Sequence, residues 1–137
     1  MIKNKGFTLI ELLVVIAIIG LLAAVVFFSV DGIKAKSRDT RRVADIKSIQ
    51  EGLAMYHNNN QKFPIFEGFL TGDDIVSEAL KTGGMNGVPV DPVNDVMAGV
   101  TYKYHYQSTQ GNDYVIEYYL ETDSIQGRSA GLNSVGP

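Results

Sequence analysis

The sequence contains no cysteine, and its only histidines are His57 and His105. Without cysteine, the chain has no disulfide bond, no thiolate nucleophile and no cysteine-ligated zinc site. Two distant histidines leave little material for a metal or catalytic centre, and no nucleophile lies beside a base along the chain. We therefore expect a protein that is not an enzyme and that carries no cofactor.

Basic residues are not in excess either, since the net charge is −3. A charge of this sign gives no global field that would attract nucleic acid. The 137 residues suffice for one domain, and strong hydrophobicity is almost confined to the residues before position 31. The sequence thus predicts two parts, an apolar N-terminal stem and a soluble head with one modest core.

Proline is absent before Pro64, so nothing interrupts the apolar stem. As a helix, residues 7–30 span about 35 Å, which is enough to cross a bilayer core. A secretory signal is one interpretation, but Ala23 and Ala24 are followed by the bulky residues 25–28, which make a poor cleavage site. A simple membrane anchor is another interpretation, in which Glu11 reaches to the interface.

A third interpretation rests on the motif Lys5-Gly6-Phe7-Thr8-Leu9-Ile10-Glu11-Leu12 and on the apolar run from Val14 to Ala24. This stretch resembles the class III signal of type IV pilins and type II secretion pseudopilins. The resemblance implies that residues 1–6 are a leader peptide and that a prepilin peptidase cuts between Gly6 and Phe7. It also implies N-methylation of Phe7 and retention of residues 7–30 as a transmembrane and filament-core helix.

Cleavage at this position would expose an α-amine on Phe7, four residues before Glu11. The ordinary pKa of such an amine is about 7.7–8.0. A carboxylate without a partner would be costly in the core of a filament. The resemblance implies that Glu11 pairs with the Phe7 amine of a neighbouring subunit, and we expect this pair to set axial register more than net stability.

Basic residues cluster directly after the stem, from Lys34 to Lys47. Counting lysine and arginine at the two ends of the stem predicts a cytoplasmic head, whereas the resemblance implies a head outside the membrane. Acidic residues alternate with the cations of this cluster, a pattern typical of a solvated or subunit-contacting face. Contact with nucleic acid phosphates is the alternative.

The helical pattern continues from Asp31 to about Asn58, where asparagines and then Pro64 end it. Apolar residues recur there at spacings of three and four, as in an amphipathic helix. The chain then alternates apolar and polar residues over 100–107 and 114–121, which predicts an antiparallel hairpin with a loop at 108–113. The apolar stripe of the helix comprises Val43, Ile46, Ile49, Leu53 and Tyr56.

The expected fold class is α+β, a long N-terminal helix packed against a small antiparallel sheet. Residues 31–60 form the amphipathic continuation of the helix, and residues 61–137 form the globular head. Residues 61–99 are expected to be mainly a connecting region, with a short helix from Asp74 to Lys81 ended by Gly83 and Gly84. Residues 123–137 stay open as a loop, a last short strand or a flexible end. The buried side of the short helix is predicted to comprise Ile75, Val76, Ala79 and Leu80.

The segment Val88-Pro89-Val90-Asp91-Pro92 resembles the approach to the sheet in major pseudopilins, where a nearby acidic loop binds calcium. This chain departs from that pattern, because Val93-Asn94 replaces an aromatic–glycine pair and the tail offers only Glu121 and Asp123. Calcium takes about six to eight oxygen ligands. We therefore interpret the acidic and amide residues here as turn-forming and expect no metal: Asp91, Asn94 and Asp95.

Taken with the resemblance, these features predict a structural subunit that polymerises into a type IV pilus. The alternative is a major-type pseudopilin of a type II secretion system. The implied partners are copies of the same chain in a helical filament, the prepilin peptidase and methylase, and an assembly platform with its ATPase. The implied location is the inner membrane before assembly, and an extracellular pilus or a periplasmic pseudopilus afterwards.

Overall fold

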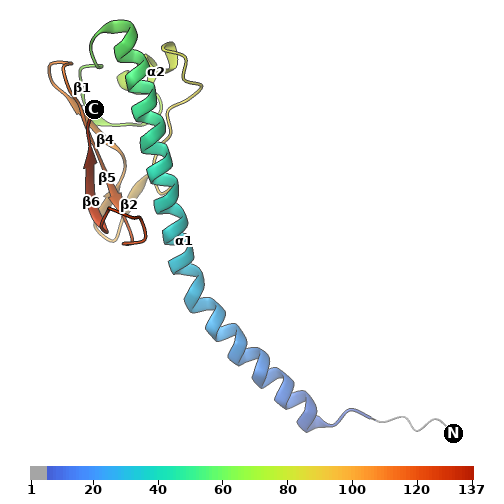
Figure 1. Ribbon diagram of the computed structural model, residues 1–137. Coiled ribbons are helices and arrows are strands. Elements are labelled where there is room, and N and C mark those ends of the chain that lie inside the picture. Colours follow the sequence, from blue (N-terminus) through green and yellow to red (C-terminus); the bar gives the residue numbers. More distant parts are fainter. Residues whose placement is uncertain (1–5) are drawn as a thin grey trace. The chain divides into compact units, whose positions relative to one another are not determined.

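The computed structural model describes the backbone of residues 6–137 and the side chains of residues 6–25 and 30–137. The first five residues of the expected leader, with Lys3 and Lys5, lie outside the described residues. By its internal contacts the chain divides into two compact units, Met1–Lys34 and Ala35–Pro137. One helix and a set of short strands account for most of the regular structure (Figure 1).

Helix α1 runs from Leu9 to Asn60, a length of 52 residues. It has no proline to break it, and it ends where Gln61 takes a left-handed backbone conformation with φ of 58°. The amide of Gln61 still donates to the carbonyl oxygen of His57 at 2.7 Å. The predicted long helix and its end near the three asparagines are confirmed.

The two halves of α1 bury very different surfaces. Every residue from Leu9 to Val25 is exposed, although nearly all are apolar. In the second unit one face of the helix is buried, with Ile46, Ile49 and Leu53 at most 1% exposed. Val43 and Tyr56 pack partly buried against the same core, so the predicted amphipathic stripe is confirmed.

The main sheet has four antiparallel strands in the order β1-β4-β5-β6. Figure 1 shows these strands beside the part of α1 that belongs to the second unit. The predicted alternation is confirmed on the inner face, where Tyr106, Ile116 and Tyr118 are buried. The α+β fold class is therefore confirmed. The strands are β1 (Phe66–Phe69), β4 (His105–Ser108), β5 (Val115–Leu120) and β6 (Gly131–Val135).

The predicted hairpin needs one correction, because its first strand is divided. Strand β3 (Val100–Tyr102) pairs with β2 (Asp95–Met97) in a separate two-stranded sheet, and only β4 pairs with β5. Ala98 and Gly99 both have positive φ, at 51° and 79°. Positive φ at both central residues is the condition for a tight turn between twisted strands, and this turn draws β3 toward β2.

The expected connecting region contains more regular structure than predicted. Strand β1 has only four residues, one of them glycine, so its sequence is too short to show alternation. Its backbone hydrogen bonds are made with β4. For residues 123–137 the sequence allows a loop, a short strand or a flexible end. The structure has strand β6 there, paired with β5 on the side opposite β4.

Helix α2 runs from Ile75 to Thr82 and matches the predicted short helix within a residue. The Asp74 side chain caps it by accepting a hydrogen bond from the Ser77 amide at 3.0 Å. The prediction that Ile75 is buried is wrong, since Ile75 is 65% exposed. Val76 and Leu80 lie four residues apart on the face that is buried, and Ile75 lies a position to one side of it.

The core of the head lies between α1, the inner face of the sheet and α2. Tyr104, which lies between β3 and β4, links this side of the core to α1, because its hydroxyl donates to Asp45 Oδ2 at 2.9 Å. Burial, and then the nearby Asp45 charge, raise the pKa of the Tyr104 hydroxyl. Besides the residues already named, the core contains Phe63, Leu70, Val88, Tyr114 and Leu120.

Candidate functional site

The first candidate site is the start of α1, where Thr8 and Glu11 bond to each other. The Thr8 amide and hydroxyl both donate to Glu11 Oε2, at 2.8 and 2.6 Å. The Glu11 amide donates in return to the Thr8 hydroxyl oxygen at 3.3 Å. This reciprocal arrangement is a capping box, which satisfies backbone donors that a helix start would otherwise leave unpaired.

The capping box gives Glu11 a role that the sequence prediction did not include. Both hydrogen bonds from Thr8 end on Oε2. Among the described residues no hydrogen bond is made to Oε1, so one carboxylate oxygen remains for a donor from outside this segment. A carboxylate can accept several hydrogen bonds at once, so capping and pairing with another molecule are compatible.

The predicted processing site lies immediately before the cap. Phe7 is 74% exposed, and a side chain added at Gly6 would meet nothing within 4 Å. Phe7, Ile10 and Glu11 line one shallow depression with Val14 and Val15. The structure thus brings Glu11 and Phe7 to one surface, and it leaves the Gly6–Phe7 bond accessible.

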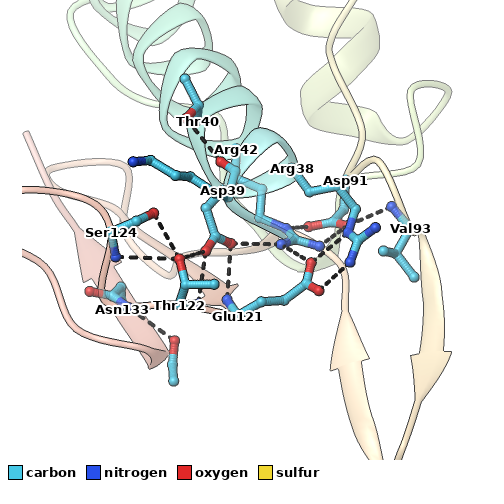
Figure 2. Close-up of polar contacts among 12 residues, drawn as sticks. Arg38, Asp39, Thr40, Arg42, Asp91, Val93, Glu121, Thr122, Ser124 and Asn133 are labelled. Atoms are coloured by element: carbon cyan, nitrogen blue, oxygen red, sulfur yellow. Dashed lines mark hydrogen bonds and ion pairs between the residues drawn. The ribbon is translucent and has the colours of Figure 1, made fainter. Parts of the chain in front are cut away.

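A second candidate site is a buried cluster of charges in the head, centred on the Arg42 guanidinium (Figure 2). Arg42 and Asp39, one turn apart on α1, are both fully buried. Arg42 Nη1 donates to Asp39 Oδ1 at 2.9 Å and to Glu121 Oε1 at 2.6 Å. Arg42 Nε and Nη2 donate to the two oxygens of Asp91, at 2.7 and 3.1 Å.

Neighbouring groups complete this arginine cluster. Arg38 Nε donates to Glu121 Oε1 at 2.7 Å, and the Arg42 guanidinium lies 4.8 Å from the ring centre of Tyr102. The Asp39 carboxylate accepts from the amides of Glu121 and Thr122, at 2.9 and 2.8 Å. The cluster therefore joins α1 to the end of β5 and to the turn at Asp91.

The electrostatics of the cluster favour its charged form. Burial alone would lower the pKa of the Arg42 guanidinium, but hydrogen bonds to Asp91 and Glu121 outweigh burial and raise the pKa above its ordinary value. The hydrogen bond from Arg38 is the largest cause that holds the pKa of Glu121 below its ordinary value. Paired in this way, the buried charges avoid the large desolvation penalty of an isolated ion.

This cluster corrects the interpretation of the basic stretch from Lys34 to Lys47. That stretch was predicted to be a solvated or subunit-contacting face, which is wrong for Asp39 and Arg42 because both are buried. Lys34, Arg41 and Lys47 are exposed, and contact with nucleic acid through them stays a prediction.

Two of the acidic residues considered for calcium, Asp91 and Asp123, already accept hydrogen bonds from other groups of the protein. Asp91 Oδ1 accepts from the Val93 amide at 2.8 Å, as a turn-forming aspartate does, and both of its oxygens also bind Arg42. Asp123 Oδ1 accepts from the Ala130 amide at 2.7 Å, and Asp95 is exposed on β2. Within the described residues no group of three or more histidine, aspartate or glutamate side chains is placed to hold a metal. The side chains present therefore do not fit a calcium site.

Sequence reasoning missed both the capping box and the arginine cluster. The spacing Thr8-x-x-Glu11 is a capping-box pattern and would have revealed the first. Asp39 and Arg42 are three residues apart, a spacing that permits an ion pair on a helix. Their partners Asp91 and Glu121 lie 49 and 79 residues from Arg42, which no local pattern can indicate.

The first 27 residues match the family model "Prokaryotic N-terminal methylation motif". Type II secretion system core protein G of Pseudomonas aeruginosa is 32% identical over 141 residues, an alignment that covers 98% of this chain and 94% of that protein. The chain belongs to the type IV pilin and pseudopilin family. The resemblance found in residues 5–24 is thereby confirmed, and it extends through the head.

Relatives of the same name from other bacteria match over shorter stretches. The protein of the same name from Escherichia coli strain K12 is 34% identical over 97 residues, or 66% of this chain and 67% of that protein. The one from Pectobacterium carotovorum is 40% identical over 65 residues, and the chain covers 42% of its length. No solved structure matches the chain. These relatives support the expected alternative, a pseudopilin, better than the pilus subunit that was the leading expectation.

Proposed function

We propose that this chain is the major-type pseudopilin of a type II secretion system, a structural subunit that polymerises into a short periplasmic filament. The observation that carries the proposal is the near full-length similarity to type II secretion system core protein G of Pseudomonas aeruginosa. The exposed apolar half of α1 supports it, because such a surface is stable only in lipid or against other apolar helices.

The processing site of the proposed subunit is the bond between Gly6 and Phe7. A prepilin peptidase cuts this bond and methylates the Phe7 amine, and residues 1–6 are lost as the leader. The open surroundings of Gly6 support access by the peptidase. The match to a methylation motif over residues 1–27 supports modification of the new N-terminus.

Before assembly, α1 anchors the proposed subunit in the inner membrane with its head on the outer side. Helix α1 is, by length and composition, the one helix among the described residues that could cross a membrane. A platform protein and an ATPase then move subunits into a helical filament of identical chains. In that filament Glu11 pairs with the Phe7 amine of a neighbour, and its oxygen Oε1 supports this role because Thr8 leaves it open.

A deletion strain tests the proposal. Removing the gene in its own host should trap exported proteins in the periplasm while surface fibres remain, and the wild-type gene should restore secretion. Loss of long surface fibres with normal secretion would instead identify a pilus subunit and contradict the proposal.

N-terminal sequencing of the membrane-bound protein provides a matched test of processing. The mature chain should begin at Phe7, and a Gly6→Val variant should accumulate as uncut precursor. A mature chain that begins after Ala24 would identify a secretory signal and would contradict the proposal.

A further inference from the structure

The arginine cluster lies in the part of the head that the family resemblance associates with calcium. The side chains of this part do not fit a calcium site, as described above. We propose that the guanidinium groups of Arg42 and Arg38, and not a metal ion, supply the positive charge that fastens the segment after β5 to α1. The head of this chain is therefore stable without divalent cations. This inference concerns the head alone and does not depend on which filament the chain builds.

The geometry around Arg42 resembles that around a bound cation. Carboxylates from three separate segments converge on one guanidinium: Asp39 from α1, Asp91 from the turn before β2, and Glu121 from the end of β5. The shortest contacts are 2.9, 2.7 and 2.6 Å. Figure 2 shows these carboxylates arranged around the Arg42 head group. A single group thus crosslinks segments that lie far apart in the sequence.

The charges nearly balance without any ion. Three carboxylates face two guanidinium groups, and the side chains of Arg42, Asp39 and Asp91 have no exposed surface. A divalent cation would have to displace a buried arginine and break its ion pairs, which is strongly unfavourable.

Hydrogen bonds within the protein already engage the polar groups of the segment after β5. The backbone amides of Glu121 and Thr122 donate to Asp39, and the Thr122 hydroxyl donates to Asp39 Oδ2 at 2.7 Å. Asp123 accepts from Ala130 across the turn. Calcium needs about six to eight oxygen ligands, and the carboxylates that would have to supply them already serve the arginines or the backbone.

Thermal unfolding of the full chain in detergent micelles tests the inference directly. The melting temperature should agree within about 1 °C between excess EDTA and roughly 5 mM calcium, a concentration above the roughly 0.1–1 mM dissociation constants of extracellular calcium modules. A calcium-induced rise of about 4 °C or more, the scale expected for real stabilisation of a domain of this size, would overturn it.

Substitution of the arginine gives the complementary test. Arg42→Ala should lower the melting temperature by about 10 °C or more, since it leaves the buried Asp39 and Asp91 without their cation and leaves Glu121 with Arg38 alone. In this variant, unlike in the wild type, calcium should raise the melting temperature, because the carboxylates can then receive an ion. Arg41→Ala is the matched control, as its side chain is largely exposed, and it should melt like the wild type.

The outcomes separate cleanly. A folded Arg42→Ala variant that melts like the wild type, or that does not respond to calcium, would overturn the inference. If Arg42→Ala does not fold, Arg38→Ala replaces it, because Arg38 is partly exposed and its side chain binds only Glu121 among the described residues. Arg38→Ala should lower the melting temperature by several degrees relative to Arg41→Ala, and equal melting of the two would contradict the proposed role.

Discussion

At the scale of single residues, Glu121 shows how position alters the chemistry of an ordinary side chain. Glu121 directly follows β5, and its carboxylate accepts hydrogen bonds from Arg38 and Arg42. The folded head therefore favours the charged form of the Glu121 carboxylate. Carboxylates of this kind link stability to pH, because folding then competes with protonation.

The sign of the pH effect follows from the direction of the shift. The folded-state pKa of Glu121 lies below its ordinary value of 4.5, so its contribution to stability is fully present above pH 4.5. That contribution is lost as the pH falls through the lower folded-state pKa. Glu121→Gln should destabilise the head by about 2 kcal/mol at pH 7 and should flatten the fall in stability below pH 4.5.

Urea unfolding of the detergent-solubilised chain at a series of pH values measures this effect. Glu67→Gln is the control, because Glu67 is an exposed carboxylate on β1. An unchanged pH profile in Glu121→Gln, or the same profile in both variants, would show that the arginine cluster does not link folding to pH.

At the scale of elements, the sequence predicted the features that repeat and missed those that depend on distant partners. Helix α1, the stripe from Val43 to Tyr56 and the β4–β5 hairpin each follow a period of 3.6 or 2. Strand β1 is too short to have a period, and it exists because β4 pairs with it. The arginine cluster escaped prediction for the same reason, since Asp91 and Glu121 meet Arg42 only after folding.

The loop between β4 and β5 is an element whose geometry depends on one glycine. Gly111 has φ of 75°, and a side chain there would lie 3.0 Å from the carbonyl oxygen of Phe63. The Phe63 amide also donates to the Gly111 carbonyl oxygen at 2.8 Å. This contact fastens the segment after α1 to the hairpin, close to the Phe63–Tyr114 ring pair at 4.8 Å.

Gly111→Ala should therefore destabilise the head by about 2–3 kcal/mol, the combined effect of a strained backbone and a contact with backbone that cannot move aside. Gly127→Ala is a matched control, because Gly127 has nearly the same φ of 76° but nothing within 4 Å. Chemical denaturation of both variants checks this. A loss in Gly111→Ala no larger than in Gly127→Ala would show that the Phe63 contact contributes nothing.

At the scale of the whole molecule, the chain combines a unit with a buried core and a unit with almost none. Residues from Ala35 onward contain all of the buried hydrophobic residues of the described chain. In the other unit, residues 9–25 are all exposed, and Glu11 is the one charged residue among them. In the proposed filament each head folds by itself, and the apolar stems pack against one another only on assembly.

Assembly is accordingly where Glu11 should matter. A Glu11→Val chain should still enter the membrane and begin at Phe7 after processing, because neither step uses the carboxylate. Its incorporation into filaments should fall by about tenfold, a loss that corresponds to about 1.4 kcal/mol. Sheared or crosslinked filaments, quantified by immunoblot against total mature subunit, measure this.

Glu11→Gln separates the two roles of this side chain. The amide can still accept from Thr8 and so preserve the cap, but it has no charge to pair with an amine. It should therefore assemble as poorly as Glu11→Val. Full assembly of Glu11→Gln would mean that capping, and not charge pairing, is what the filament requires.

The exposed half of α1 has a last consequence, which concerns disassembly. In the proposed filament, this apolar helix moves from lipid into a bundle of identical helices, and both surroundings are apolar. The transfer therefore gains little hydrophobic free energy. The free-energy difference between the assembled and the membrane-bound subunit is then small, and helix packing and one charge pair determine it. In the proposed filament, the return of a subunit from the helix bundle to the bilayer should therefore cost little free energy.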